Sequence, residues 1–159
     1  MTSAELQRLV KGHDWLWQQW WPALLELSGE QARKEVGGSF PNIYTTTLHM
    51  VGAEWAWQER LEGNSPKALP GSEWAKDMRA LKERWDEVAA RRSKYLETAD
   101  ASARKPYRMI NDTPAENTVA EIHLHVISHA HFHRGQSASQ FRLLGLKPPS
   151  AHYIGFFRL

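Results

Sequence analysis

Apolar residues recur at helical spacing in four long segments of the chain. The first segment runs from about Ala4 to Leu27, and its apolar positions fall three or four residues apart, as in an amphipathic helix. Thr2 followed by Glu5 forms a capping box at its start, and Ser28-Gly29 is expected to end it. Pro22 lies inside this segment and predicts a kink or a break there.

The second and third segments are separated by a loop rich in proline and glycine, residues 63–71. The second spans about Pro41 to Leu61, with Ser39 as its expected N-cap. It is apolar around most of its circumference, which indicates a helix that is central in the fold or packed on another subunit. Ser72 can cap the third helix, which runs to about Glu97 and has a charged, solvated face.

The fourth segment begins at a second capping box, formed by Thr118 and Glu121, and stops at Gly145 after about Leu144. The stretch from Arg104 to Asp112 is compatible with a short hairpin. The aromatic tail over 147–159 is expected to pack on the rest of the protein. The pattern predicts an all-α four-helix bundle, with residues 1–159 forming a single domain.

The composition narrows the function. The chain has 159 residues and no cysteine, which excludes disulfides, thiolate metal sites and a cysteine nucleophile. Its 20 basic and 18 acidic residues are interspersed, so no basic face for nucleic acid is expected. No apolar run approaches the roughly 20 residues of a membrane helix, and the start of the chain lacks a secretory pattern. We therefore expect a cytoplasmic protein with no nucleic-acid or membrane partner.

Five of the eight histidines lie between His123 and His133. His125, His129 and His133 are four residues apart, so they share one helix face, as the imidazoles of an H-x-x-x-H metal site do. A stripe of imidazoles in an apolar helix is costly unless it is paired or liganded, so the spacing favours metal binding. The alternative is one or two buried, hydrogen-bonded histidines. His123 and His131 point elsewhere and are expected at the surface.

A catalytic metal site has three protein ligands and an open position, so another helix must supply a ligand. His49, between apolar neighbours in the second helix, is one candidate; His13 in the first helix is a rival, and His152 in the tail is less favoured. Glu54 follows His49 by five residues, about 140° around the helix. A salt bridge is therefore expected of Glu54, and a role as general base is not.

Two segments together resemble the DinB-like family, also called DinB/YfiT-like. The first covers 39–63 and contains Thr47-Leu48-His49 and Ala53-Glu54. The second resembles the family's H-V-x-x-H-x-x-x-H-R-G-Q segment through His125-Val126, His129 and His133-Arg134-Gly135-Gln136. Leu144-Gly145, Pro148-Pro149 and Phe157-Arg158 fit as well, so the similarity covers nearly the whole chain.

The resemblance implies an up-down-down-up bundle, usually a homodimer, with a divalent metal ion held by three histidines. By position these are His49, His129 and His133, and His125 becomes a neighbour of the site. Zn or Ni is the expected ion, since neutral imidazoles suit both. The tryptophans of the first two helices are then expected in the core and the subunit interface. Arg134 is expected to form a structural ion pair near the dimer contact, with an anionic substrate group as the alternative partner.

Relatives in this family include transferases that use low-molecular-weight thiols. The resemblance therefore predicts a metal-dependent enzyme for a small-molecule substrate, by thiol transfer or by hydrolysis. Because the chain has no cysteine, any thiol would come from a small molecule. The alternatives are a non-catalytic, metal-binding dimer in a stress response or interaction module, and a bundle that keeps no metal. The sequence assigns no catalytic residue.

Overall fold

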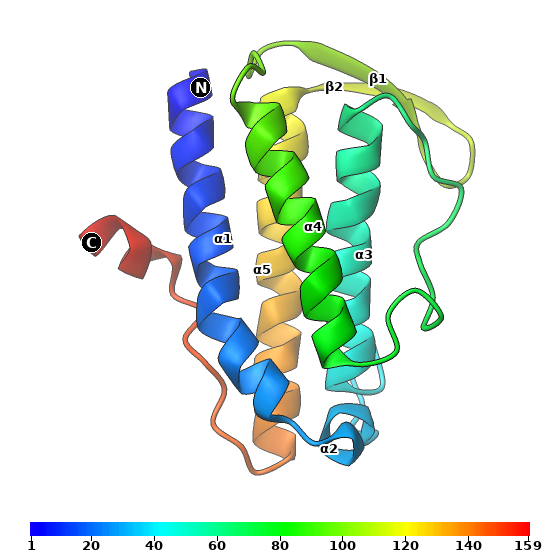
Figure 1. Cartoon of the computed structure of the whole chain (residues 1–159), viewed down its shortest axis with the longest axis vertical. Helices are drawn as coiled ribbons and strands as arrows, with labels where there is room; N and C mark the ends of the chain where they lie inside the picture. Colours follow the sequence, from blue (N-terminus) through cyan, green and yellow to red (C-terminus); the bar gives the residue numbers. More distant parts are fainter.

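The computed structural model describes all 159 residues, and four long helices lie side by side in it (Figure 1). They are α1 (Ser3–Glu26), α3 (Ile43–Leu61), α4 (Met78–Leu96) and α5 (Val119–Leu143). The remaining elements are α2 (Gly29–Arg33), the antiparallel strands β1 (Arg104–Arg108) and β2 (Pro114–Thr118), and the 3-10 helix η1 (Tyr153–Arg158). The protein is mostly helical, as expected, and the predicted hairpin is present. No helix combines the length and the apolar character that crossing a membrane requires.

The ends of α5 lie where the sequence predicts them. Thr118 accepts a hydrogen bond from the backbone N–H of Glu121, whose carboxylate in turn accepts from the backbone N–H of Thr118. At the other end Gly145 has a φ of 76°, a left-handed conformation that suits glycine and stops the helix. The same reciprocal box at Thr2 and Glu5 opens α1. Local capping chemistry therefore sets these ends.

Two predicted helix starts are wrong. The N-cap of α3 is Asn42, whose side chain accepts from the backbone N–H of Thr45 at 2.9 Å, and not Ser39. The N-cap of α4 is Asp77, so this helix starts later than the predicted cap at Ser72. Both stretches contain two residues able to cap a helix, and cap preference does not choose between serine and asparagine or aspartate. Packing of the chain makes that choice.

Around the end of α1 the chain is more helical than predicted. The α1 helix continues through Pro22, and its last turns lean toward α2 (Figure 1). Proline removes a helical hydrogen bond and crowds the preceding turn, so a kink without a break is the outcome. Ser28, expected to terminate the helix, is also the N-cap of the short helix α2, in a capping box with Gln31 that the sequence analysis missed.

Tryptophans of α1 form the centre of the core. Trp17, Trp20 and Trp21 are fully buried, and the rings of Trp17 and Trp21 stack with centroids 4.9 Å apart. Trp85 of α4 packs beside them, 5.8 Å from Trp17. Aromatic side chains bury roughly 150–250 Å² each, so this cluster is a large part of the contact between α1 and α4. The core prediction for these tryptophans is confirmed.

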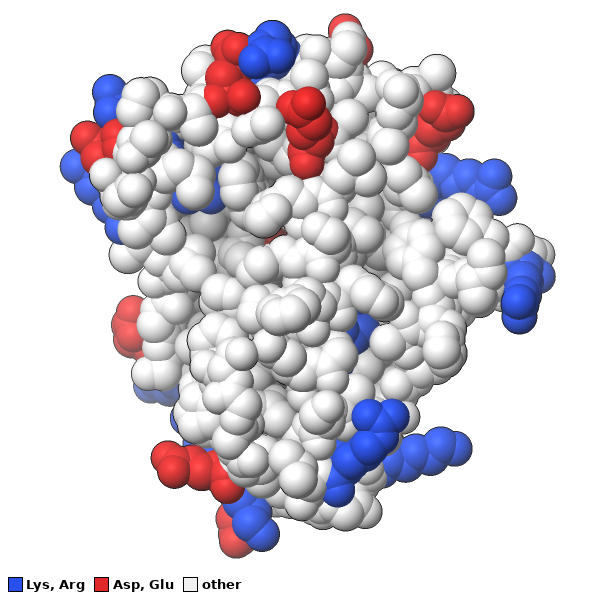
Figure 2. All heavy atoms as spheres, turned by 180° about the vertical axis from the view of Figure 1, so that it is seen from behind, with Lys and Arg blue, Asp and Glu red and all other residues white.

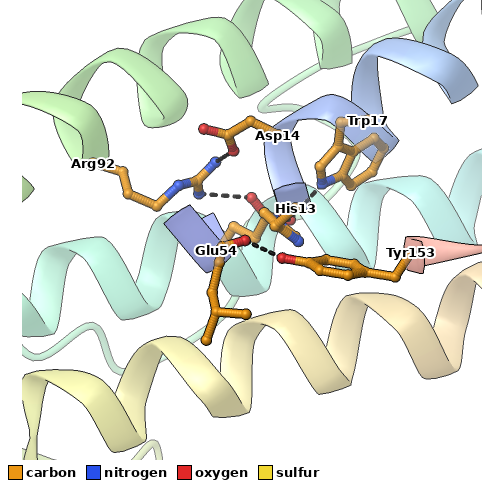
Figure 3. A network of polar contacts seen from close by, with 7 residues as sticks. His13, Asp14, Trp17, Glu54, Arg92 and Tyr153 are labelled. Atoms are coloured by element: carbon orange, nitrogen blue, oxygen red, sulfur yellow. Dashed lines mark hydrogen bonds and ion pairs between the residues drawn. The ribbon is translucent and has the colours of Figure 1, made fainter. Parts of the chain in front are cut away.

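A buried carboxylate joins three helices (Figure 3). Glu54 of α3 accepts hydrogen bonds from Trp17 Nε1 at 2.7 Å and from Arg92 of α4 at 2.8 Å, and its Oε1 lies 3.0 Å from His13 Nε2. Arg92 also pairs with Asp14 of α1. Burial alone would raise the pKa of Glu54, but the charges of His13 and Arg92 hold it well below its usual range. The predicted salt bridge of Glu54 is confirmed.

Glu54→Gln is expected to destabilise the protein by about 3–5 kcal/mol, because it leaves Arg92 buried without its main counter-charge. Urea denaturation at neutral pH measures this loss. The matched control is Glu59→Gln on the same helix, which breaks a partly exposed pair with Arg91 and should cost less than about 1 kcal/mol. Because the pKa of Glu54 is depressed on folding, its contribution is present above the unfolded value of about 4.3 and falls as acid is added. Equal losses in the two variants would contradict this assignment.

Candidate metal centre

Imidazoles from α3 and α5 meet at one point. His49 Nε2 lies 3.0 Å from His129 Nε2, and one ring nitrogen from each of His49, His129 and His133 lies within 4.8 Å of the other two. A tetrahedral zinc ion with bonds of 2.0–2.1 Å holds its nitrogen ligands roughly 3.3 Å apart. Small side-chain shifts would therefore bring all three nitrogens onto one ion. The structure thus brings together the three residues that the resemblance singles out.

The register between α3 and α5 is fixed close to His49. Thr46 of α3, about one turn before His49, donates its hydroxyl to the side-chain oxygen of Gln140 on α5 at 2.9 Å. The amide nitrogen of Gln140 donates to the backbone carbonyl of Phe40 at 2.9 Å. Both Thr46 and Gln140 are buried, so these bonds are protected from water. They hold His49 opposite the two histidines of α5.

Gln136 orients the third imidazole. The side-chain oxygen of Gln136 lies 2.7 Å from Nδ1 of His133, so it accepts a hydrogen bond when that nitrogen carries the proton. Gln136 donates its own amide nitrogen to the hydroxyl of Ser39 at 2.9 Å, which fixes the amide. His133 Nε2 is left with a free lone pair, the arrangement found in metal-ligating histidines. Ser39, expected as a helix cap, serves this network instead.

The site is half-buried, and this burial keeps the imidazoles of His49 and His129 neutral at neutral pH. Burial, with the positive field of neighbouring His133, lowers the pKa of His49 and of His129 to about 4 each. Both rings therefore offer lone pairs at neutral pH. The ring of Phe40 covers one side, with its centroid 4.6 Å from that of His49 and 5.6 Å from that of His133. A set of three imidazole ligands fits a borderline divalent ion such as zinc or nickel.

The rival ligands lie elsewhere. His13 is buried against Glu54, and His152 is exposed in the tail. His125 is one turn before His129, with ring centroids 5.8 Å apart, and stays outside the cluster as a neighbour. The open choice between His49 and His13 is thereby resolved in favour of His49 as the histidine that joins the pair on α5.

Of the two histidines expected at the surface, His131 is exposed but His123 is buried, with only 1% of its surface accessible. The Nδ1 of His123 lies 2.8 Å from the backbone carbonyl of Val119, one turn earlier in α5. This local bond satisfies one ring nitrogen and makes burial tolerable. The prediction for His123 is wrong because α5 is covered on more than one side, and a polar residue on a covered side leaves no mark in the apolar pattern.

A cleft of about 470 Å³ opens beside the cluster, and His49 and His129 form part of its wall. Arg60, three turns after His49 on α3, lines the same cleft. Its guanidinium lies over the ring of Trp57 at 4.5 Å and donates from Nε to the carbonyl of Arg108, and no carboxylate pairs with it. The loop of the hairpin closes the cleft on another side, and no aspartate or glutamate lines it. Sequence reasoning missed Arg60, although its spacing from His49 puts both on one face.

The fold and the histidine cluster agree with the comparison to known proteins. The family model described as "DinB family" matches residues 1–159, and the chain belongs to this family. "Uncharacterized protein YizA" of Bacillus subtilis (strain 168) is 25% identical over 154 residues, covering 92% of this chain and 94% of the relative. "Protein DinB" of the same organism is 23% identical over 155 residues, covering 92% and 90%. The resemblance drawn from the two motifs is confirmed.

Proposed function

We propose that His49, His129 and His133 bind one divalent metal ion and that this centre serves an enzyme acting on small molecules. The observation that carries the proposal is the convergence of three imidazole nitrogens within 4.8 Å at the wall of a cleft. A structural metal site is closed by four protein ligands, whereas a catalytic one keeps an open position. Three histidines beside a cleft of about 470 Å³ support the second kind.

Membership of the family supports the up-down-down-up topology as the finer description of the fold. In Figure 1 the connection between α3 and α4 runs along the length of the helices, which fits two helices pointing the same way. Helix α5 lies beside α3, and the contacts from Thr46 to Gln140 and from His49 to His129 join the two helices. The cluster then belongs to the middle of the bundle and not to its loops.

A divalent ion at this centre would lower the pKa of a bound thiol or water and so supply a nucleophile at neutral pH. The residues that line the cleft determine which substrates can enter it. Trp57 and the hairpin loop give the cleft apolar walls, and Arg60 offers a guanidinium without a carboxylate partner. A substrate with an anionic group and an apolar part fits these walls.

The lining of the cleft favours thiol transfer over hydrolysis. Glu54, the carboxylate nearest in sequence to His49, is committed to Arg92 and is buried on the other side of α3. No carboxylate lines the cleft to act as a general base. A thiol ionised by the metal itself needs no such base, whereas hydrolysis of a demanding substrate gains from one. Since the chain has no cysteine, the thiol would be a low-molecular-weight compound.

Metal analysis tests the site directly. Untagged protein is expected to contain close to one divalent ion per chain by mass spectrometry, and His129→Ala is expected to lose it, because the variant removes one of three ligands. His131→Ala is the matched control, since it removes an exposed imidazole from the same helix. Folded parent protein that takes up no added zinc or nickel would refute the metal centre. Equal metal loss in both variants would refute this ligand set.

Gln136→Leu tests whether the hydrogen bond to His133 supports metal binding. Its removal frees the orientation and the tautomer of the imidazole, so zinc affinity is expected to fall about 10–100-fold with all three histidines present. Competition with a chromophoric chelator measures this affinity. Ser139→Ala on the same helix, whose hydroxyl bonds only to the backbone of Gly135, should bind zinc like the parent. An unchanged affinity in Gln136→Leu would contradict the role given to Gln136.

We also propose that the chain forms a homodimer through α5. The buried tryptophans of α1 are core and are not available for such a contact. Phe132 and Leu143 are 63% and 65% exposed and lie three turns apart on one face of α5. The face seen in Figure 2 is largely free of charged side chains at its centre and carries them around its rim. A metal-binding dimer without turnover, acting as an interaction module, is the alternative function that this surface supports.

Phe132→Glu tests the proposed contact, because a charge at the centre of an apolar interface opposes association. Light scattering coupled to size exclusion is expected to give a dimer for the parent and a monomer for the variant. Leu25→Glu, at an exposed leucine of α1, should remain a dimer. A monomeric parent would end the dimer proposal and leave the metal centre untouched.

A further inference from the structure

The side chain of Arg134 is buried without a partner. Only 1% of the residue is accessible, and none of its three guanidinium nitrogens makes a hydrogen bond or an ion pair. The guanidinium lies 5.2 Å from the ring of Trp17 and 5.9 Å from that of Trp20. A guanidinium is protonated at neutral pH, so Arg134 is a buried cation. The prediction that Arg134 forms a structural ion pair is therefore wrong.

Arg134 lines a groove of about 310 Å³ between α1 and α5, separate from the cleft beside the histidine cluster. The groove has apolar walls, formed by Leu9 and Leu16 of α1 and by Leu124 and Ile127 of α5. Arg134 is ten residues after Leu124, so the two lie about 15 Å apart along α5. The hydroxyl of Tyr153 donates to the carbonyl of Leu9 and brings the tail against the groove (Figure 3). The volume is that of a small-molecule site.

A second polar group without a partner borders the same groove. His13 lines it, and while its Nε2 faces Glu54 at 3.0 Å, its Nδ1 is buried and makes no hydrogen bond (Figure 3). No aspartate or glutamate lines the groove, so Arg134 has no counter-charge there. A buried cation without an acceptor, at the edge of an apolar cavity, complements a ligand that brings its own anion and an apolar body.

We propose that this groove binds a small monocarboxylate with an extended apolar chain. The carboxylate pairs with the guanidinium of Arg134, whose planar fork of N–H donors matches two carboxylate oxygens. The apolar chain lies between Leu9 and Leu124. Because the guanidinium nitrogens are screened from solvent, a side chain at the rim must shift on entry, a common change of rotamer on binding. The site needs no metal ion.

Calorimetric titration tests the proposal on whole protein freed of metal by chelation and dialysis. The probes are octanoate, 1-octanol and acetate, which separate the charge from the chain. Octanoate is expected to bind at least tenfold more tightly than either of the others. Arg134→Met should lower the affinity for octanoate at least tenfold and leave the affinity for 1-octanol unchanged. Arg134→Lys keeps a charge and should retain part of the preference for octanoate over 1-octanol.

Two surface variants keep the test decisive if Arg134→Met does not fold. Leu124→Glu places a negative charge at the exposed wall of the groove and is expected to lower the affinity for octanoate at least tenfold. Leu25→Glu changes a leucine of nearly the same exposure, 41% against 44%, on α1 outside the groove, and should bind like the parent. Equal octanoate affinity in these two variants would overturn the proposal.

The parent and Arg134→Met also differ in their expected melting. Without ligand the variant should melt at or above the temperature of the parent, because it removes an unpaired buried charge, and octanoate should raise only the melting temperature of the parent. No preference of the parent for octanoate over 1-octanol, or the same preference in Arg134→Met, would overturn the proposal. Arg134 would then be satisfied by buried water and the tryptophan rings alone.

Discussion

The buried carboxylate of Glu54 determines how three helices of this protein meet. It accepts hydrogen bonds from α1 and α4 in a region closed to water, so neither helix can slide or turn without breaking a hydrogen bond to this buried charge. Glu54 also fixes the rotation of its own helix. His49 lies five residues earlier, about 140° around α3, and is therefore directed away from α1 and α4 toward α5. The position of His49 therefore follows from the ion pair of Glu54 on the opposite side of the same helix.

Helix α5 carries buried polar groups on two sides, and the two sides differ in how these groups are satisfied. Toward α3, His129 has His49 as its partner and His133 has Gln136. Toward α1, Arg134 has only the faces of two tryptophan rings. A cation–π contact contributes roughly 0.5–2 kcal/mol, whereas the penalty for burying an ion is several kcal/mol. The fold therefore keeps a net cost at Arg134, and natural proteins keep such costs mainly at functional sites.

The sequence predicted the parts of the fold that depend on local chemistry. Both ends of α5 follow from Thr118, Glu121 and Gly145, because a capping box and a left-handed glycine act within one helical turn. The starts of α3 and α4 could not be predicted in this way. Ser39 and Asn42, like Ser72 and Asp77, are all competent caps, and only the packing of the complete chain selects one of each pair.

The candidate site was predictable only in part, because spacing within one helix is local whereas the pairing of helices depends on the packing of the whole chain. Four-residue spacing puts His125, His129 and His133 on one face of the helix, and the resemblance selects His129 and His133 from these three. Spacing within a helix says nothing about which other helix packs against it. His49 and His13 were both open until the resemblance favoured His49, and the hydrogen bond between Thr46 and Gln140 is the contact that sets this pairing. The burial of Arg134 could not be predicted from the sequence. A polar residue interrupts the apolar pattern in the same way whether its face of the helix is buried or exposed.

The charges around the two cavities point to the same class of ligand by different routes. Three imidazole ligands carry no negative charge and would leave a bound divalent ion with its full charge, and the cleft adds Arg60 and no carboxylate. Such a cleft stabilises anions, which favours an ionised thiol or an anionic substrate over a cationic one. The groove at Arg134 has no metal donors, yet its unpaired guanidinium and apolar walls also select an anion. Positive charge without internal counter-charge is thus the property common to both cavities, and it contrasts with the chain as a whole, in which 20 basic residues stand against 18 acidic ones.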